Sequence, residues 1–79
     1  MDIILTDHAS YQMRRRRITM EDIRLILDLG QHSEGEEEQT MEACAEIDGR
    51  PITVIYDELD HRFRDIFRVI TVIRKRCRE

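Results

Sequence analysis

The chain has 79 residues, a formal net charge of −4 and a hydrophobic fraction of 41%. A chain of this length forms one small domain, residues 1–79, whose core is a thin layer of helices on one sheet or a small bundle, which excludes a two-domain enzyme and a fold built around a large cofactor. No run of about 18 apolar residues occurs, so a membrane-spanning helix is also excluded.

The first predicted elements are a short strand and a helix. The apolar residues 3–5 predict the strand. Either Thr6 or Asp7 can cap the helix that follows, because both side chains accept hydrogen bonds from backbone N–H groups. No Gly, Pro or β-branched residue occurs between Asp7 and Arg17. We therefore predict a helix over residues 7–16.

A second helix is predicted over residues 20–29. Thr19 and Asp22 have the spacing of a capping box, which marks a helix start. The apolar residues that follow lie on one helical stripe, and Gly30 is a typical C-terminal cap.

After the second helix, the apolar residues recur at every second position. This period predicts one strand over residues 40–47 and another over 52–57, joined by a hairpin turn at Asp48 and Gly49. The polar residues 58–64 predict a loop, and 65–74 predict the last strand. The fold class predicted is α+β, with two N-terminal helices packed on an antiparallel sheet of three to four strands.

The last predicted strand is apolar on both faces. Strict alternation places Ile66, Ile70 and Val72 on one face and Phe67, Val69 and Ile73 on the other. Because two helices cover only one face of the sheet, we expect a second copy of the chain to cover the face with Phe67, making a homo-oligomer.

The remaining polar residues predict no cofactor and no metal site. Cys44 and Cys77 are far apart and lack C-x-x-C spacing, so both are expected to be free thiols. His32 and His61 are expected in surface loops. The N-terminus lacks the apolar run of a signal peptide, so we expect a cytoplasmic protein without membrane contact.

Charge is distributed unevenly along the chain. Residues 1–30 are neutral, residues 31–60 carry a charge of −9 and residues 61–79 a charge of +5. The acidic segment 34–46 is expected to lie over the basic last strand. All but one of the 13 basic residues are Arg, whose planar guanidinium suits phosphate. Two interpretations stay open: a phosphate-binding surface, or a bias in composition without function.

Several short motifs, spread over nearly the whole chain, carry a resemblance to a known family. They are His8-Ala9, Met13, Arg16, Ile18-Thr19, Asp22-Ile23, Gly49-Arg50, Val54 and Val69-Ile70-Thr71-Val72. In order and spacing they resemble the small prokaryotic family called domain of unknown function 4258. That family is similar in turn to the RelE, ParE, BrnT and MqsR toxins. The resemblance implies a RelE-like fold, metal-independent RNA cleavage, and RNA or an antitoxin protein as partner.

Such cleavage needs a base, an acid and cations on the phosphate. His8, Tyr11 and Arg15 are three and seven residues apart on one helical face, with Arg16 on an adjoining stripe. The candidate catalytic residues are therefore His8, Tyr11 and Arg16, and the candidate phosphate-binding residues are Arg15, Arg68 and Arg74. The alternatives are that His8 is a structural helix-start residue and that residues 14–17 are a solvated helix end.

Two functions follow from these features. One is a small endoribonuclease or ribosome-associated toxin, which the resemblance favours. The other is a non-catalytic dimerising or partner-binding module, which the acidic net charge and the scarcity of aromatic residues favour.

Overall fold

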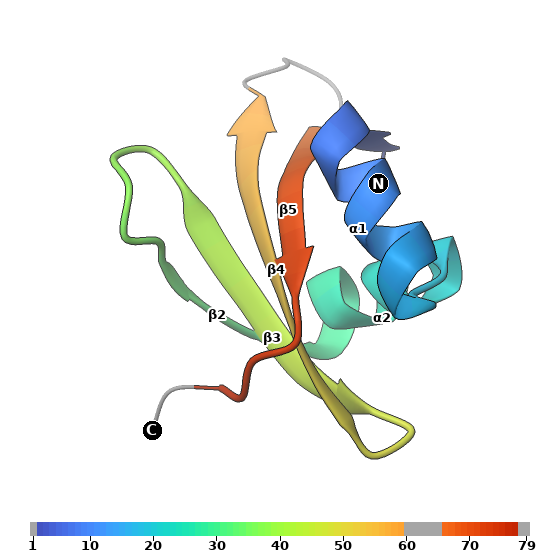
Figure 1. Ribbon diagram of the computed structural model, residues 1–79. Coiled ribbons are helices and arrows are strands. Elements are labelled where there is room, and N and C mark those ends of the chain that lie inside the picture. Colours follow the sequence, from blue (N-terminus) through green and yellow to red (C-terminus); the bar gives the residue numbers. More distant parts are fainter. Residues whose placement is uncertain (1, 60–65, 78–79) are drawn as a thin grey trace.

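The computed structural model describes residues 2–59 and 66–77, which form two helices on a five-stranded sheet (Figure 1). In chain order the elements are β1 (Asp2–Leu5), α1 (Asp7–Arg16), α2 (Met20–Leu29), β2 (Gln31–Glu34), β3 (Met41–Ile47), β4 (Arg50–Leu59) and β5 (Ile66–Ile73). The strand order is β1-β5-β4-β3-β2. The α+β class and both predicted helices are confirmed.

The sheet differs from the prediction in strand number and direction. It has five strands instead of three to four, and it is mixed because β1 runs parallel to β5. The missed strand is β2, whose residues are all polar and exposed. Such a segment carries no hydrophobic period, and β2 forms through its antiparallel pairing with β3.

The hairpin between β3 and β4 turns where it was predicted. Asp48 and Gly49 have φ angles of 51° and 76°, the left-handed values that a two-residue hairpin turn requires. β4 is longer than predicted and includes Glu58 and Leu59. The loop after β4 therefore begins later in the chain than predicted. The rest of that loop, including His61, lies outside the described residues.

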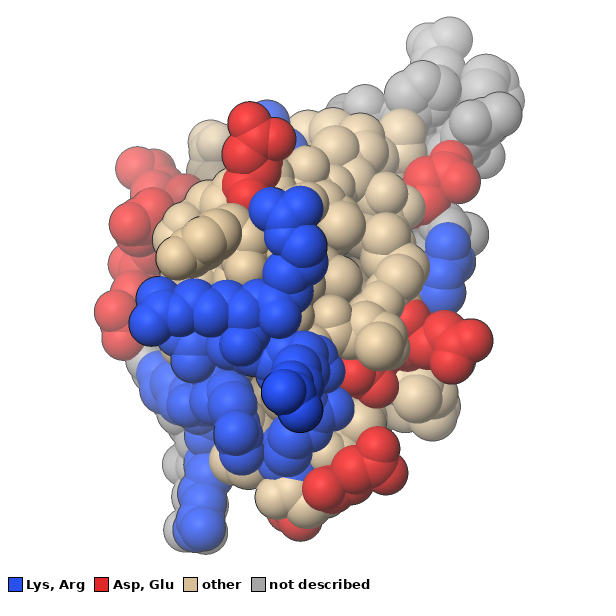
Figure 2. Space-filling model, turned by 45° about the vertical axis from the view of Figure 1, so that its right-hand side comes forward, with Lys and Arg blue, Asp and Glu red and all other residues tan. Residues whose placement is uncertain are grey.

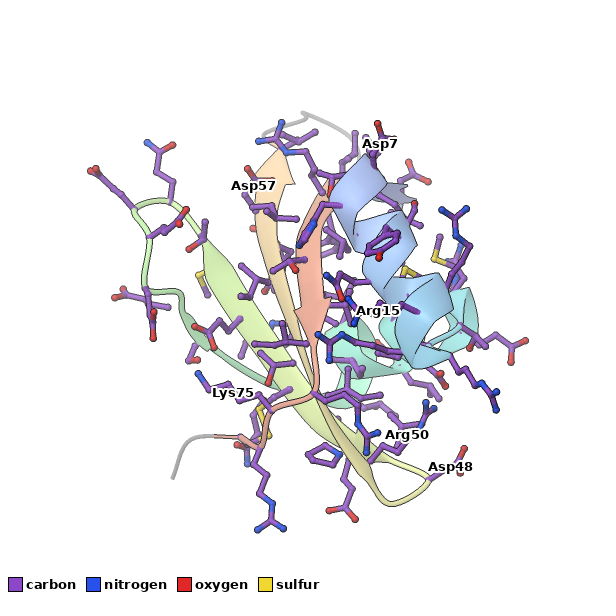
Figure 3. The ribbon with its side chains drawn as sticks, viewed as in Figure 1. Asp7, Arg15, Asp48, Arg50, Asp57 and Lys75 are labelled. Atoms are coloured by element: carbon purple, nitrogen blue, oxygen red, sulfur yellow. A yellow bond between two sulfur atoms is a disulfide. The ribbon has the colours of Figure 1, made fainter. Side chains whose placement is uncertain are left out.

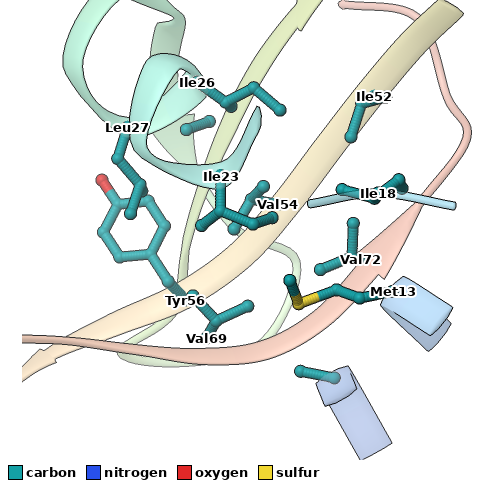
Figure 4. Close-up of a cluster of buried hydrophobic side chains, with 12 residues drawn as sticks. Met13, Ile18, Ile23, Ile26, Leu27, Ile52, Val54, Tyr56, Val69 and Val72 are labelled. Atoms are coloured by element: carbon teal, nitrogen blue, oxygen red, sulfur yellow. The ribbon is translucent and has the colours of Figure 1, made fainter. Parts of the chain in front are cut away.

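Both helices pack on one face of the sheet and form a single core with it (Figure 4). α1 lies over β5 and β1, and α2 lies over β3 and β4. The buried hydrophobic residues are Ala9, Met13, Ile18, Ile23, Ile26, Leu27, Ala43, Ile52, Val54, Tyr56, Val69 and Val72. We call the other side of the sheet, which carries no helix, the open face.

A bulge in β5 changes which of its residues face the core. Tyr56 pairs with Val69 and Ile55 pairs with Thr71, so Ile70 is the extra residue of the bulge. As a result Val69 and Val72, three positions apart, are both fully buried against the helices.

The predicted faces of the last strand are therefore wrong for Phe67 and Val69, whereas Val72 faces the helices and Ile73 the open face, as predicted. Phe67 and Val69 lie on the helix side of the sheet, where Phe67 packs edge-to-face on Tyr56 with ring centroids 5.3 Å apart. They need no second copy to cover them. The half-buried isoleucines of β5 on the open face are Ile66, Ile70 and Ile73.

Thr6 joins the start of α1 to the bulge. Its hydroxyl accepts a hydrogen bond from the Ala9 N–H at 3.1 Å, which makes Thr6 the N-cap. The same hydroxyl donates to the Ile70 carbonyl at 2.9 Å, and the Thr6 N–H donates to the Val69 carbonyl at 3.1 Å. One side chain thus satisfies a helix end and the irregular part of β5.

Cys44 and Cys77 form a disulfide, so the prediction of two free thiols is wrong. After β5 the chain turns and crosses the open face toward β3 (Figure 1). This path brings the two Cα atoms to 5.4 Å although the residues are 33 positions apart. Residues 74–77, called here the C-terminal strap, contain no regular structure whose pattern could have indicated that path.

Candidate functional site

Arginines gather where α1 ends. Arg14, Arg15 and Arg16 form the last turn of the helix, and Arg17 is its C-cap. Cations are favourable there because the helix dipole places partial negative charge at the C-terminal carbonyls. Figure 2 shows basic side chains collected in one patch on this side of the molecule, with acidic side chains around it.

Arg50 holds this end of α1 in place, and sequence reasoning missed it. Its Nη1 donates to the Arg17 carbonyl at 2.9 Å and to the Arg16 carbonyl at 3.3 Å. Its Nη2 lies 3.4 Å from Oδ2 of Asp22, the capping-box residue of α2. Figure 3 shows Arg15 and Arg50 on the same side of the molecule. We call Arg14–Arg17 together with Arg50 the arginine cluster.

Arg50 could be noticed in the sequence only as part of the Gly49-Arg50 dipeptide. Its partners Arg16 and Arg17 are 34 and 33 positions away, and no local pattern indicates contacts over that distance. These hydrogen bonds make Arg50 a positioning residue that links the end of α1 to the start of α2.

Arg16 differs from its neighbours in the cluster. It is half-buried, and its Nε donates to Oε1 of Gln12 at 2.9 Å, whereas Arg14 and Arg15 are exposed. The stem of Arg16 therefore packs while its head is hydrogen-bonded.

We expect Arg16→Ala to lower the melting temperature by about 4 to 8 °C, because it removes a hydrogen bond and buried stem contacts that contribute about 1 kcal/mol. Arg14→Ala is the matched control, since it shortens an exposed arginine in the same turn and should change stability by less than about 0.5 kcal/mol. Thermal unfolding followed by circular dichroism measures both. Equal shifts in the two variants would contradict the fixed position of Arg16.

The candidate catalytic residues His8 and Tyr11 lie on the outer face of α1. Both are exposed, and Arg15 shares their face. His8 is two turns before the arginine cluster, since eight residues of α-helix separate it from Arg16 by about 12 Å along the axis. The expected helical face of His8, Tyr11 and Arg15 is thus present and open to solvent.

The two candidate arginines near the C-terminus lie in different places. Arg68 is on the open face, where its Nε donates to Oδ1 of Asp57 at 3.0 Å and its Nη2 bonds to the other carboxylate oxygen. The hydrogen bonds to Asp57 raise the pKa of Arg68. The sheet separates Arg68 from α1, so it does not join the arginine cluster.

Arg74 directly follows β5 at the end of the sheet that carries the last turn of α1. Val72, two residues earlier, packs beside Met13 and Ile18 (Figure 4). Arg74 is exposed. The structure therefore brings Arg74 to the same end of the molecule as Arg15 and Arg16, while Arg68 lies on the opposite face.

His32 is not in a surface loop but in β2, and it links two elements. Its Nε2 lies 2.9 Å from the Leu27 carbonyl at the end of α2, and its Nδ1 lies 2.6 Å from the Tyr56 hydroxyl. Because a carbonyl only accepts, Nε2 donates to it, and in the tautomer protonated at Nε2 alone Nδ1 accepts the Tyr56 proton. Burial, and secondly the charge of Glu58, raise the pKa of Tyr56, which keeps that proton in place.

We expect Tyr56→Phe to lower the free energy of unfolding by about 1 kcal/mol at pH 7, because Nδ1 of His32 loses its donor. A raised pKa in the folded state means that the Tyr56 contribution is complete below pH 10 and is lost as the pH rises through the folded value. The variant should therefore lose less stability than the parent as the pH rises above about 10. Tyr11→Phe, at the exposed tyrosine, is the control in urea unfolding, and identical profiles for all three proteins would contradict the expectation.

Within the described part of the chain, no three His, Cys, Asp or Glu side chains are grouped so that they could hold a metal ion. No helix among residues 2–59 and 66–77 is long and apolar enough to cross a membrane.

Comparison with known proteins gives one match. The family described as "Domain of unknown function (DUF4258)" matches residues 5–74, which include both helices and the strands β2 to β5. No curated protein and no solved structure matches the chain.

Proposed function

The chain belongs to this family of unknown function, and we propose that it is a small RNA-directed protein of the RelE-like toxin type that binds RNA phosphates through its arginine cluster. The observation that carries the proposal is the gathering of Arg14–Arg17 at one helix end, fixed there by Arg50. An exposed guanidinium group binds two oxygens of one phosphate through two parallel hydrogen bonds, which suits the phosphates of a nucleic-acid backbone. RNA and an antitoxin protein are the partners in this proposal, and the cytoplasm is the location.

The exposed face of α1 supplies the reactive groups in the proposed cleavage. His8 takes the proton of the ribose 2′-hydroxyl, and the 2′-oxygen attacks the phosphorus. Tyr11 donates its proton to the leaving 5′-oxygen, so the product is a cyclic phosphate and a free 5′-hydroxyl. Arg15, on the same helical face, balances the negative charge that collects on the phosphate.

RNA binding is tested by fluorescence anisotropy with a labelled single-stranded RNA over a series of salt concentrations. We expect Arg15→Gln, Arg17→Gln and Arg74→Gln to weaken binding and to reduce the log–log salt slope by about 0.7 for each phosphate group that the variant no longer binds. The matched control is Arg24→Gln, at an exposed arginine of α2. Equal affinity in Arg24→Gln and in the two cluster variants, Arg15→Gln and Arg17→Gln, would reject the cluster as the binding surface.

Catalysis is tested separately by incubating the same RNA with the parent chain and with His8→Ala, and by expressing each in growing cells. Cleavage and growth arrest by the parent that His8→Ala abolishes, with RNA affinity unchanged, would support the proposed chemistry. Binding without cleavage by the parent would leave an RNA-binding protein and reject the enzyme.

The second candidate function is a non-catalytic dimerising module. The observation behind it is the open face, where Ile55, Ile70 and Ile73 are half-buried and no helix packs. A second copy that covers this face would bury them. Light scattering at micromolar concentration should then give twice the 9.5 kDa of one chain, and Ile70→Thr should shift it toward the single-chain mass.

A further inference from the structure

The open face carries a groove of about 190 Å³ beside the C-terminal strap. Three isoleucines form its apolar part, and polar side chains from β3, from β5, from the turn before β3 and from the strap surround them. Its lining residues are Ile55, Ile70, Ile73, Thr71, Thr40, Glu36, Glu37, Glu42 and Lys75. Access to this groove therefore depends on where the strap lies.

The strap is tied to the sheet by a covalent bond and a hydrogen bond. Cys77 is bonded to Cys44 in β3, and the Thr53 hydroxyl in β4 donates to the Lys75 carbonyl at 2.9 Å. Cys44 and Thr53 are direct partners across the two strands, so both ties lie side by side on the open face. Thr53 is only 2% exposed although no helix covers that face.

The two cysteines are placed so that opening their bond leaves the sheet intact. Cys44 is in the middle of β3 and is paired on one side with Gln31 and on the other with Thr53. Cys77 follows the last strand by four residues and belongs to no regular element. The strap is thus the segment that gains freedom when the covalent tie is removed.

We propose that the Cys44–Cys77 disulfide is a redox latch that holds the strap over Thr53 and the end of the groove. A dithiol reductant attacks one of the two sulfurs as a thiolate and forms a mixed disulfide, and its second thiolate then releases the other cysteine. Two electrons and two protons pass to the chain, which ends with two thiols, and the reductant becomes a disulfide.

The released strap leaves the sheet because the single hydrogen bond from Thr53 to Lys75 does not offset the entropy of ordering four residues. Its departure exposes Thr53 and removes Lys75 from the groove. In a reducing compartment the latch is open, and on oxidation it closes.

Trypsin provides a direct test, because the strap contains Arg74, Lys75 and Arg76. The whole protein is purified in air, its disulfide is verified by intact mass, and cleavage within the strap is timed with and without dithiothreitol. We expect at least a tenfold increase in the cleavage rate on reduction, while the methyl NMR signals of Val54 and Val72 in the core stay in place.

Two variants test whether the disulfide, and not the hydrogen bond from Thr53, holds the strap in place. Cys77→Ser should be cleaved at the fast rate with or without dithiothreitol. Thr53→Val, which keeps the disulfide but loses the hydrogen bond to Lys75, should stay slow until it is reduced. Equal cleavage rates before and after reduction, or core signals that collapse on reduction, would overturn the latch, as would free thiols in the air-purified protein.

Discussion

Removing the Cys44–Cys77 disulfide is expected to lower the free energy of unfolding by about 3 kcal/mol and the melting temperature by more than about 10 °C. In the chain-entropy model, a crosslink between residues 33 positions apart restricts the unfolded chain more than the folded one. A small domain has roughly 5 to 15 kcal/mol of stability in total, so the reduced protein should remain folded with a reduced margin.

The measurement is thermal unfolding of the parent chain with and without dithiothreitol, beside the double variant Cys44→Ser/Cys77→Ser. The double variant should match the reduced parent and should not respond to the reductant. A loss below about 1 kcal/mol would contradict the crosslink effect. An unfolded double variant would contradict the expectation that helices and sheet persist without the bond.

Both helices could be predicted to the residue because their signals are local. Thr19 and Asp22 form the capping box in the structure, with both reciprocal hydrogen bonds present. Thr6, one of the two predicted N-caps of α1, is the one that caps it. A cap and the turn it starts are separated by three or four residues, so the sequence alone contains the whole interaction.

The sheet could be predicted only where a hydrophobic period exists. β3 has the expected faces, with Ala43 on the helix side and Cys44 on the open face, although Glu42 on the open face is also buried. β2 has no apolar residue, and the bulge at Ile70 has no local signature. These features depend on the neighbouring strand, so alternation along β5 alone placed Val69 on the wrong face.

The candidate site was partly predictable for the same reason. The helical face of His8, Tyr11 and Arg15 follows from spacing along one element, and the structure presents it as expected. Whether Arg68 or Arg74 accompanies it depends on which sheet face and which end of β5 each occupies. Neither property can be read from the residue type: Arg68 lies within β5 on the open face, and Arg74 directly follows the end of β5.

The separation of charges explains how an acidic chain can present a basic surface. Glu36 and Glu37 line the groove on the open face together with Lys75, whereas Arg68 of β5 pairs with Asp57 of β4. The arginine cluster lies at the end of α1, on the helix side of the sheet. The net charge of −4 therefore does not describe the electrostatic field at the arginine cluster.

The connection between α1 and the bulge of β5 gives the last expectation. Thr6→Val keeps the shape of the side chain and removes its hydroxyl, so the Ala9 N–H loses its cap and the Ile70 carbonyl loses a donor. Loss of a cap costs about 1 kcal/mol, and a partly buried carbonyl left without its partner costs at least about 1 more. We expect a total loss of about 2 to 3 kcal/mol in urea unfolding.

Thr6→Ser is the matched control because it retains the hydroxyl and both of its hydrogen bonds, and it should lose less than about 1 kcal/mol. The Thr6 N–H still donates to the Val69 carbonyl in both variants, so the parallel pairing of β1 with β5 is preserved. The difference between the two variants then isolates the hydroxyl. If Thr6→Val and Thr6→Ser unfolded at the same urea concentration, the bulge would be held by the pairing of β4 with β5 alone. The hydroxyl of Thr6 would then play no part in placing Val69 and Val72 on the core side of the sheet.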